Sequence, residues 1–251
     1  MRAPERLSKL SLIIPARDEQ DGLATTIEHI TDELSPHQVP YEIVVVDDGS
    51  TDRTWQVLTE LESRFALLRA MKNPGPYGFG RALTYGLERM AGDAAVIMMA
   101  DDSDDCADVV RYWHKLNEGF DCVFGSRFME RGCVTGYPRL KLLLNRLFNR
   151  SLVHLFRIPL DDTTNGFKAY RKRVLFGCQP FRSAGFELNV ELPLKAILRG
   201  YSWTVVPVTW RGRRSGTSKF WLLREGFHYA ITAAALWLEH PRSPAVRVPQ
   251  P

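Results

Sequence analysis

The sequence predicts an α/β fold: a mainly parallel sheet flanked by helices, with amphipathic helices towards the C-terminal end. After a loose leader at residues 1–9, apolar runs of strand length alternate with helical patterns up to about residue 130. Such alternation predicts right-handed β–α–β units. Beyond residue 130, two longer segments with apolar residues at helical spacing replace the alternation.

The individual elements follow from these patterns. Strands are expected near residues 10–14, 42–47, 67–71, 94–100 and 120–125. Helices are expected near residues 21–34, 51–64, 79–91 and 106–118. With 251 residues, of which 45% are hydrophobic and 25% charged, the chain has the size and composition of a globular protein with a full core.

Charge and cysteine content narrow the class of protein. A net charge of +4 is too small to indicate a nucleic-acid-binding protein. The four cysteines have neither metal nor disulfide spacing, which indicates reduced thiols. Since no signal peptide opens the chain, we expect a cytoplasmic protein.

The most informative segment is AAVIMMADDSDD at 94–105, where an apolar strand leads directly into four carboxylates. These are Asp101, Asp102, Asp104 and Asp105. Carboxylates this close repel one another unless a cation or hydrogen-bond donors neutralise them. Because Mg²⁺ and Mn²⁺ take oxygen ligands, the run predicts a metal site. The alternative is a solvated acidic loop that caps a helix starting near Cys106.

Two other predicted strands also end in polar residues. Asp47 and Asp48 follow the β-branched run at 43–46, which is typical of a strand buried on both faces. The strand near the N-terminus is followed by Arg-Asp-Glu at 17–19. Because an α/β sheet binds its ligands at the carboxyl ends of its strands, these ends together predict one shared cleft.

Polar residues in the second half of the chain are less decisive. Arg127 emerges at a predicted strand end, where its planar guanidinium suits either a phosphate or a salt bridge to a nearby aspartate. The polar loop 161–166 either binds a ligand or only turns the chain, and the basic loop 211–219 either closes over an anion or is solvated. The six histidines form no catalytic cluster, so we expect no nucleophilic catalysis.

Two segments combine apolar residues at helical spacing with basic residues. Segment 139–157 holds five Lys/Arg and no acid, and segment 220–238 carries aromatic residues beside Arg224 and His228. Each segment suits a helix packed on the core or a helix lying in a membrane interface. Together they favour the membrane surface, although neither has an apolar run long enough to span a bilayer.

In this order, the motifs resemble those of family 2 glycosyltransferases of the Rossmann-like GT-A fold, and most closely the dolichol-phosphate (polyprenyl-phosphate) mannosyltransferase-like enzymes. The resemblance runs from about residue 10 to residue 238. IIPARDE, VVVDDGSTD and the aspartate motif after the fourth strand are shared across family 2. GSRF, DTTNGFKAYRK, ELNVELPLKAILRGY and W-x-x-R-x-x-G-x-S-K are more specific to the polyprenyl-phosphate branch.

The resemblance implies roles for individual residues. Nucleotide-sugar contacts are expected for Pro15, Ala16, Glu19, Asp47, Asp48, Asp101 and Asp102. Asp101 is expected to bind Mg²⁺ or Mn²⁺ on the donor diphosphate. Contacts to the acceptor phosphate are expected for Arg127, Arg139, Arg213, Ser218 and Lys219. Catalytic roles are expected for Asp101, Asp104, Arg127 and Arg213.

The chain departs from the family pattern at one point. The family usually has Asp-x-Asp at the metal strand end, whereas this chain has Met99-Ala100-Asp101, followed by a literal Asp102-Ser103-Asp104.

The resemblance implies an inverting glycosyltransferase that moves a sugar from a nucleotide-diphosphate sugar to a polyprenyl (dolichyl-type) phosphate. One alternative is a family 2 transferase that acts on a soluble glycan hydroxyl, with Asp104 or Asp105 as the base. The other is an inactive sugar-nucleotide-binding protein.

The expected organisation is a GT-A catalytic domain over 1–215, an amphipathic juxtamembrane segment over 216–240 and a disordered tail over 241–251. We expect a peripheral protein on the cytosolic face of a membrane, where a membrane partner subunit is a further candidate partner.

Overall fold

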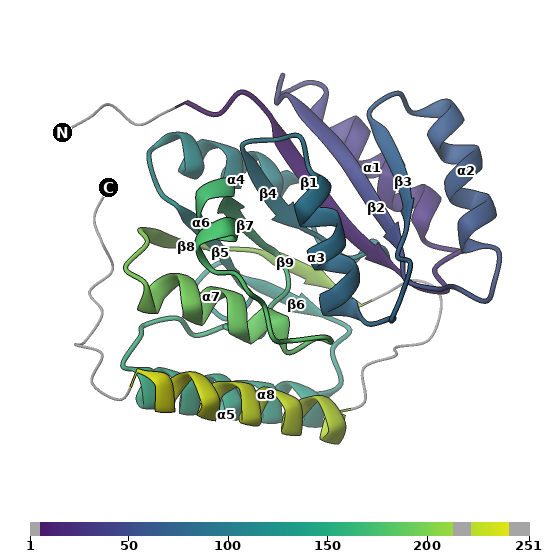
Figure 1. Cartoon of the computed structure of the whole chain (residues 1–251). Coiled ribbons are helices and arrows are strands. Elements are labelled where there is room, and N and C mark those ends of the chain that lie inside the picture. Colours follow the sequence, from purple (N-terminus) through teal and green to yellow (C-terminus); the bar gives the residue numbers. More distant parts are fainter. Residues whose placement is uncertain (1–5, 213–221, 241–251) are drawn as a thin grey trace.

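A seven-stranded sheet forms the centre of the molecule (Figure 1). The structure is a computed structural model that describes residues 6–212 and 222–240. The strand order is β3–β2–β1–β4–β7–β5–β8. These strands are β1 (Leu10–Ala16), β2 (Tyr41–Asp47), β3 (Leu68–Lys72), β4 (Ala94–Ile97), β5 (Cys122–Ser126), β7 (Lys168–Arg171) and β8 (Trp203–Pro207). Two short strands, β6 (Cys133–Thr135) and β9 (Thr209–Arg211), pair outside this sheet.

Helices cover both faces of the sheet (Figure 1). They are α1 (Leu23–Leu34), α2 (Thr54–Arg64), α3 (Phe79–Arg89), α4 (Ala107–Asn117), α5 (Arg139–Phe156), α6 (Lys172–Gly177), α7 (Leu188–Leu198) and α8 (Leu222–Glu239). Apolar residues of α1, α2 and α4 form one core cluster, and those of α3 and α5 to α8 form a second. Ile43 and Val45 enter the first cluster, while Val44 and Val46 enter the second. The predicted burial of this strand on both faces is therefore confirmed.

The topology brings the ends of the parallel strands to one edge of the sheet. β1, β2, β3 and β4 run parallel, and Ala16 at the end of β1 lies opposite Asp47 at the end of β2. β7 is antiparallel to both β4 and β5, and β5 is parallel to β8. The loops that follow β1, β2, β4 and β5 therefore meet at the same edge.

Two predicted elements differ from the structure. Strand β7, which pairs between β4 and β5, was not among the expected strands. The strand expected at 94–100 ends at Ile97, because the backbone N–H of Met99 donates to Oδ2 of Asp104 within its own loop, at 3.0 Å. The loop that carries the aspartates therefore begins at residue 98, although residues 98–100 are apolar.

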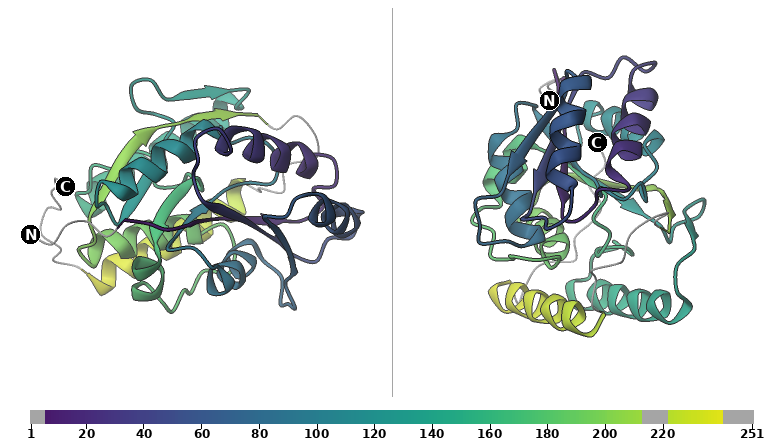
Figure 2. Two further views of the ribbon diagram at one scale, coloured as in Figure 1. Left: turned by 90° about the horizontal axis from the view of Figure 1, so that it is seen from above. Right: turned by 90° about the vertical axis from the view of Figure 1, so that its right-hand side faces the viewer.

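The two predicted amphipathic helices form and lie side by side as a separate layer (Figures 1 and 2). We call α5 and α8 together the platform. The rings of Phe148 and Tyr229 join the two helices, with centroids 5.9 Å apart. Among the described residues, no helix combines the length and the apolar character that a membrane crossing requires. The predicted tail over 241–251 lies outside the described residues, and the predicted domain division stays a prediction.

Candidate active site

A cavity of about 880 Å³ lies between the acidic edge of the sheet and the platform. The end of β1 and the loops after β1, β2 and β4 line it with Pro15 to Glu19, Asp48 and Asp101. The platform helices line it with Lys141 and His228 among others. The shared cleft expected from the strand ends is therefore confirmed.

Hydrogen bonds tie the loop after β1 to the loop after β2. Oδ1 of Asp18 accepts from the backbone N–H of Thr51 at 2.6 Å and from its hydroxyl at 3.2 Å. The backbone N–H of Asp18 donates to Oγ of Ser50 at 2.9 Å, and that of Glu19 donates to Oγ1 of Thr54 at 2.8 Å. This wall of the cavity is therefore held by several cross-loop bonds.

The two adjacent acids at the end of β2 have different surroundings. Asp48 lines the cavity and accepts hydrogen bonds from Nδ2 of Asn73 at 2.7 Å and from the N–H of Gly78 at 2.9 Å. A Cβ at Gly78 would lie 2.4 Å from the carbonyl oxygen of Ala184, so only glycine fits there. Asp47 is buried outside the cavity lining and accepts from the N–H of Ser50 at 3.2 Å.

The four carboxylates after β4 point in different directions. Asp101 and Asp104 line the large cavity. Asp102, with a φ of +57°, turns towards His29, whose Nδ1 lies 2.7 Å from its Oδ1, and lines a separate pocket of about 270 Å³. Oδ1 of Asp105 accepts from the N–H of Ala107 at 3.1 Å, at the start of α4. Asp105 also lies 3.3 Å from Nη2 of Arg211, so it contacts the start of α4 and β9, whereas Asp101 and Asp104 line the large cavity.

The cavity-facing part of this loop is suited to a cation. Burial raises the pKa of Asp104 to about 7; the Met99 N–H lowers it and the charge of Asp101 raises it further. Oγ of Ser103 is buried without a hydrogen-bond partner among the described residues. Two carboxylates and an unsatisfied hydroxyl form an all-oxygen donor set of the kind that Mg²⁺ and Mn²⁺ bind. The residues present therefore fit a divalent cation, although Met99 replaces one carboxylate.

Arg127 lines the cavity but is already paired. Its Nε and Nη2 donate to the two carboxylate oxygens of Asp162 at 2.8 and 2.7 Å, and both side chains are buried. The salt-bridge alternative for Arg127 is therefore confirmed for these two donors. The polar loop after residue 161 supplies the partner, so its role includes holding this arginine.

The other expected site residues divide into three groups. Those that line the cavity are Pro15, Ala16, Glu19, Asp48, Asp101, Asp104 and Arg127. Those that do not line it are Asp47, Asp102 and Arg139, the last of which is exposed at the first position of α5. Those that lie outside the described residues are Arg213, Ser218 and Lys219.

Several cavity residues were not expected from the sequence. The ring of Tyr77 packs so closely on Gly49 that a Cβ there would lie 2.6 Å from its Cζ. Tyr137 meets Trp210 edge to face, with ring centroids 5.0 Å apart. The cavity is also lined by Glu187, Glu225 and His228. Glu225 and His228 are three residues apart, so they lie on one face of a helix. This spacing is the one feature of the sequence that could have indicated that they lie together.

Comparisons with known proteins identify the family of the chain. The model of the family described as "Glycosyl transferase family 2" matches residues 11–176. Dolichol-phosphate mannosyltransferase of Pyrococcus furiosus is 31% identical over 84% of this chain, which spans 59% of that protein's length. Polyprenol monophosphomannose synthase of Mycolicibacterium smegmatis is 30% identical, over 83% of this chain and 79% of that protein.

A solved structure shares the fold. Glucosyl-3-phosphoglycerate synthase from Mycobacterium tuberculosis, crystallised with Mn²⁺, UDP and phosphoglyceric acid, matches with a TM-score of 0.68 at 21% identity. The match covers 94% of this chain and 79% of that one. The predicted GT-A fold is confirmed, and the family match covers well over half of the sequence. The chain therefore belongs to glycosyl transferase family 2.

Proposed function

We propose that the protein transfers a hexose from a nucleotide-diphosphate sugar to a polyprenyl phosphate at a membrane surface, with inversion at the anomeric carbon. The observation that carries this proposal is the cavity itself, which is lined by carboxylates of the sheet edge on one side and by the amphipathic platform helices on the other. The names of the two relatives support a polyprenyl phosphate acceptor and make mannose the first donor sugar to test.

The donor is proposed to bind along the acidic wall. Asp48, Tyr77 and the residues from Pro15 to Glu19 line its end near β1 and β2, where the nucleoside would lie. Asp101 and Asp104, with Ser103, would hold Mg²⁺ or Mn²⁺ on the diphosphate. When bound, such a cation stabilises the charge that develops on the leaving diphosphate.

The acceptor phosphate is proposed to enter from the platform side, where Lys141 and Arg224 line the cavity. One of its oxygens attacks the anomeric carbon and forms the new C–O bond, while the bond to the nucleoside diphosphate breaks on the opposite face. Because a phosphate is already anionic at neutral pH, this attack requires no strong base, and positioning and electrostatics carry most of the catalysis. For Arg213, Ser218 and Lys219, a role in holding the acceptor remains part of the proposal.

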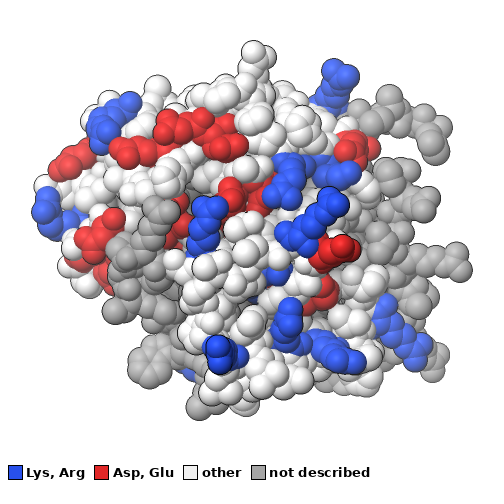
Figure 3. Space-filling view, turned by 180° about the vertical axis from the view of Figure 1, so that it is seen from behind, with Lys and Arg blue, Asp and Glu red and all other residues white. Residues whose placement is uncertain are grey.

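The platform is proposed to lie on the cytosolic leaflet of a membrane. Large apolar residues are exposed on both of its helices, namely Leu140, Leu143, Leu144, Leu147, Leu155, Phe227, Ile231, Trp237 and Leu238. Exposed basic residues of α5 accompany them, among them Arg146 and Arg150. In the view from behind, Lys and Arg lie both at the lower edge, where the platform lies, and higher on this face, whereas the visible carboxylates lie above the lower edge (Figure 3). An apolar face with flanking cations is typical of interfacial helices.

One observation favours a second candidate function. Asp104 faces the cavity with a pKa of about 7, which suits a general base for a hydroxyl acceptor on a soluble glycan. A lipid phosphate needs no such base, so the identity of the acceptor decides between the two.

The test is a transfer assay with labelled GDP-mannose, UDP-glucose and UDP-N-acetylglucosamine in the presence of Mn²⁺. Each donor is offered with a polyprenyl phosphate and, separately, with soluble oligosaccharides. We expect label in the lipid extract for one donor. Label only in the oligosaccharides would favour the second function, and donor binding without transfer to either would favour the inactive sugar-nucleotide-binding protein.

A further inference from the structure

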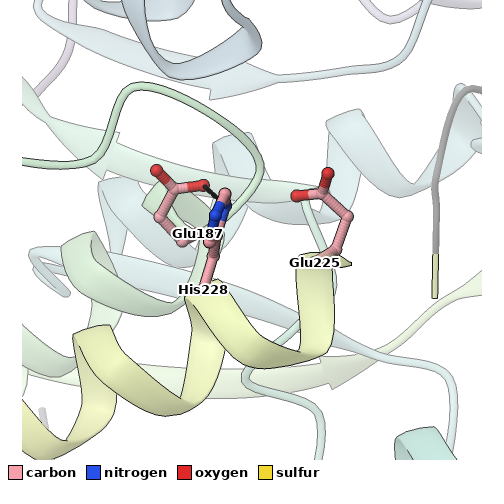
Figure 4. Close-up of side chains that lie close together, drawn as sticks. All are labelled: Glu187, Glu225 and His228. Carbon is pink, nitrogen blue, oxygen red and sulfur yellow. Dashed lines mark ion pairs between the residues drawn. The ribbon is translucent and has the colours of Figure 1, made fainter. Parts of the chain in front are cut away.

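Three side chains form a separate cluster on the platform side of the cavity. Glu187 lies directly before α7, and Glu225 and His228 lie one turn apart on α8 (Figure 4). One ligand atom from each, two carboxylate oxygens and an imidazole nitrogen, lies within 4.8 Å of the others. All three residues line the large cavity, and they come from different elements than Asp101 and Asp104.

The hydrogen bonds around this cluster leave one buried oxygen atom, on Glu187, without a partner among the described residues. Oε1 of Glu187 accepts from the N–H groups of Ala184 and Gly185, both at 3.0 Å. Oε2 of Glu187 is buried without a hydrogen bond to any described residue, and Nδ1 of His228 lies 4.0 Å from it. Hydrogen bonds therefore fix the Glu187 carboxylate through Oε1, while Oε2 has no hydrogen bond among the described residues.

Glu225 is the second carboxylate of the cluster. It is only 7% exposed. Two carboxylates held together at low exposure are unfavourable unless a positive charge compensates them. The neighbouring Arg224 offsets part of this negative charge, and a bound divalent cation would offset more of it.

We propose that Glu187, Glu225 and His228 bind a divalent transition-metal cation such as Zn²⁺, at a site distinct from the one proposed at Asp101. Zn²⁺ binds imidazole nitrogen and carboxylate oxygen, and three protein ligands are a common number for it. Mg²⁺ is less suited, because one ligand is an imidazole. The bound cation joins α8 to the segment before α7 and so holds the platform against the rest of the molecule. This inference is independent of the proposed acceptor.

The test is calorimetric titration of the metal-stripped full-length protein with Zn²⁺. We expect the wild type to bind one more Zn²⁺ than Glu225→Gln or His228→Gln, or to bind it at least tenfold more tightly, which corresponds to about 1.4 kcal/mol. His154→Gln, an exposed histidine on the neighbouring helix α5, is the matched control and should bind like the wild type. Asp101→Asn should also retain this binding.

Two further measurements keep the outcome unambiguous. Thermal melts without metal should show Glu225→Gln at least as stable as the wild type, since it removes a buried charge, so lost binding would not reflect unfolding. Hydrogen exchange of the α8 amides should slow on Zn²⁺ addition in the wild type and not in His228→Gln. The proposal is overturned if the wild type binds no more Zn²⁺ than Glu225→Gln does, or if Asp101→Asn removes the binding instead.

Discussion

The acidic edge of the sheet and the platform face each other across one cavity, but they are built in different ways. At the acidic edge, carboxylates such as Asp18 and Asp48 are held by short hydrogen bonds to neighbouring loops. On the platform, Leu143 and Phe227 are 55% and 65% exposed and contribute little to the core. The difference suits the two kinds of recognition that we propose: fixed polar groups for a charged ligand, and an exposed apolar surface for a lipid environment.

The largest expected effect concerns the pair that holds Arg127 in the cavity wall. Asp162→Ala should lower the free energy of unfolding by about 3–5 kcal/mol, because it leaves a buried guanidinium without its carboxylate. Denaturant unfolding measures this loss. As a control, Arg173→Ala removes a pair whose arginine is exposed and should cost at most about 1 kcal/mol. If Asp162→Ala cost no more than the control, Arg127 would not be locked by this pair.

The next largest effect should fall on catalysis at the acidic edge. Asp101→Asn should reduce transfer by about 10²–10³-fold, in the range seen when one group that stabilises transition-state charge is lost. The melting temperature should change little. Asp104→Asn is the comparison variant, measured at saturating Mn²⁺. A larger loss of transfer for Asp104→Asn than for Asp101→Asn would indicate that the metal ligands are those of Asp102-Ser103-Asp104 rather than Asp101.

A pH effect on stability should follow from Asp104. Its pKa is raised from 3.8 to about 7, mainly by burial, so the folded state holds this proton more tightly than the unfolded state does. The stabilisation is therefore present below about pH 4 and is lost as the pH rises through about 7. The test compares the unfolding free energies of the wild type and Asp104→Asn, both kept metal-free with a chelator. Between pH 5 and pH 8, the wild type should lose about 2–3 kcal/mol of unfolding free energy relative to the variant. A pH-independent difference would show that the Asp104 carboxylate is better solvated than its burial indicates.

The smallest effect should be seen on the platform. Arg150→Gln should weaken binding to anionic vesicles about fivefold, because one basic residue near an anionic surface contributes about 1 kcal/mol. Co-sedimentation at low and high salt measures it, and binding should fall with salt. Arg53→Gln, an exposed arginine just before α2, is the control and should have no effect. Equal weakening by both variants would mean that the platform does not direct membrane binding.

Much of the fold could be predicted because its signals are local. The β-branched run at 43–46 and the spacing of leucines in α5 determine burial and periodicity within single elements. Strand β7 could not be predicted, since its short segment lies in a polar stretch and its pairing depends on β4 and β5, which are distant in sequence.

The site could be predicted in place but not in detail. The acidic run after β4 was recognisable, yet which carboxylates face the cavity depends on the Met99 N–H and on the positive φ of Asp102. The pairing of Arg127 with Asp162 joins residues 35 positions apart, and the cluster around Glu187 forms only where α8 packs on α7. Such tertiary contacts leave no periodic signal in the sequence.

The central claim is that a lipid phosphate enters the cavity from the platform side and accepts the sugar. The most direct test identifies the atom that accepts the sugar. Vesicles containing either a polyprenyl phosphate or the corresponding polyprenol alcohol are incubated with the protein, Mn²⁺ and the preferred labelled nucleotide sugar. A phosphate oxygen as the nucleophile predicts a labelled, inverted glycosyl phosphate with the first vesicles and no lipid product with the second. Equal labelling of the polyprenol, or transfer only to a water-soluble hydroxyl compound, would contradict the assignment of the platform side to a lipid phosphate.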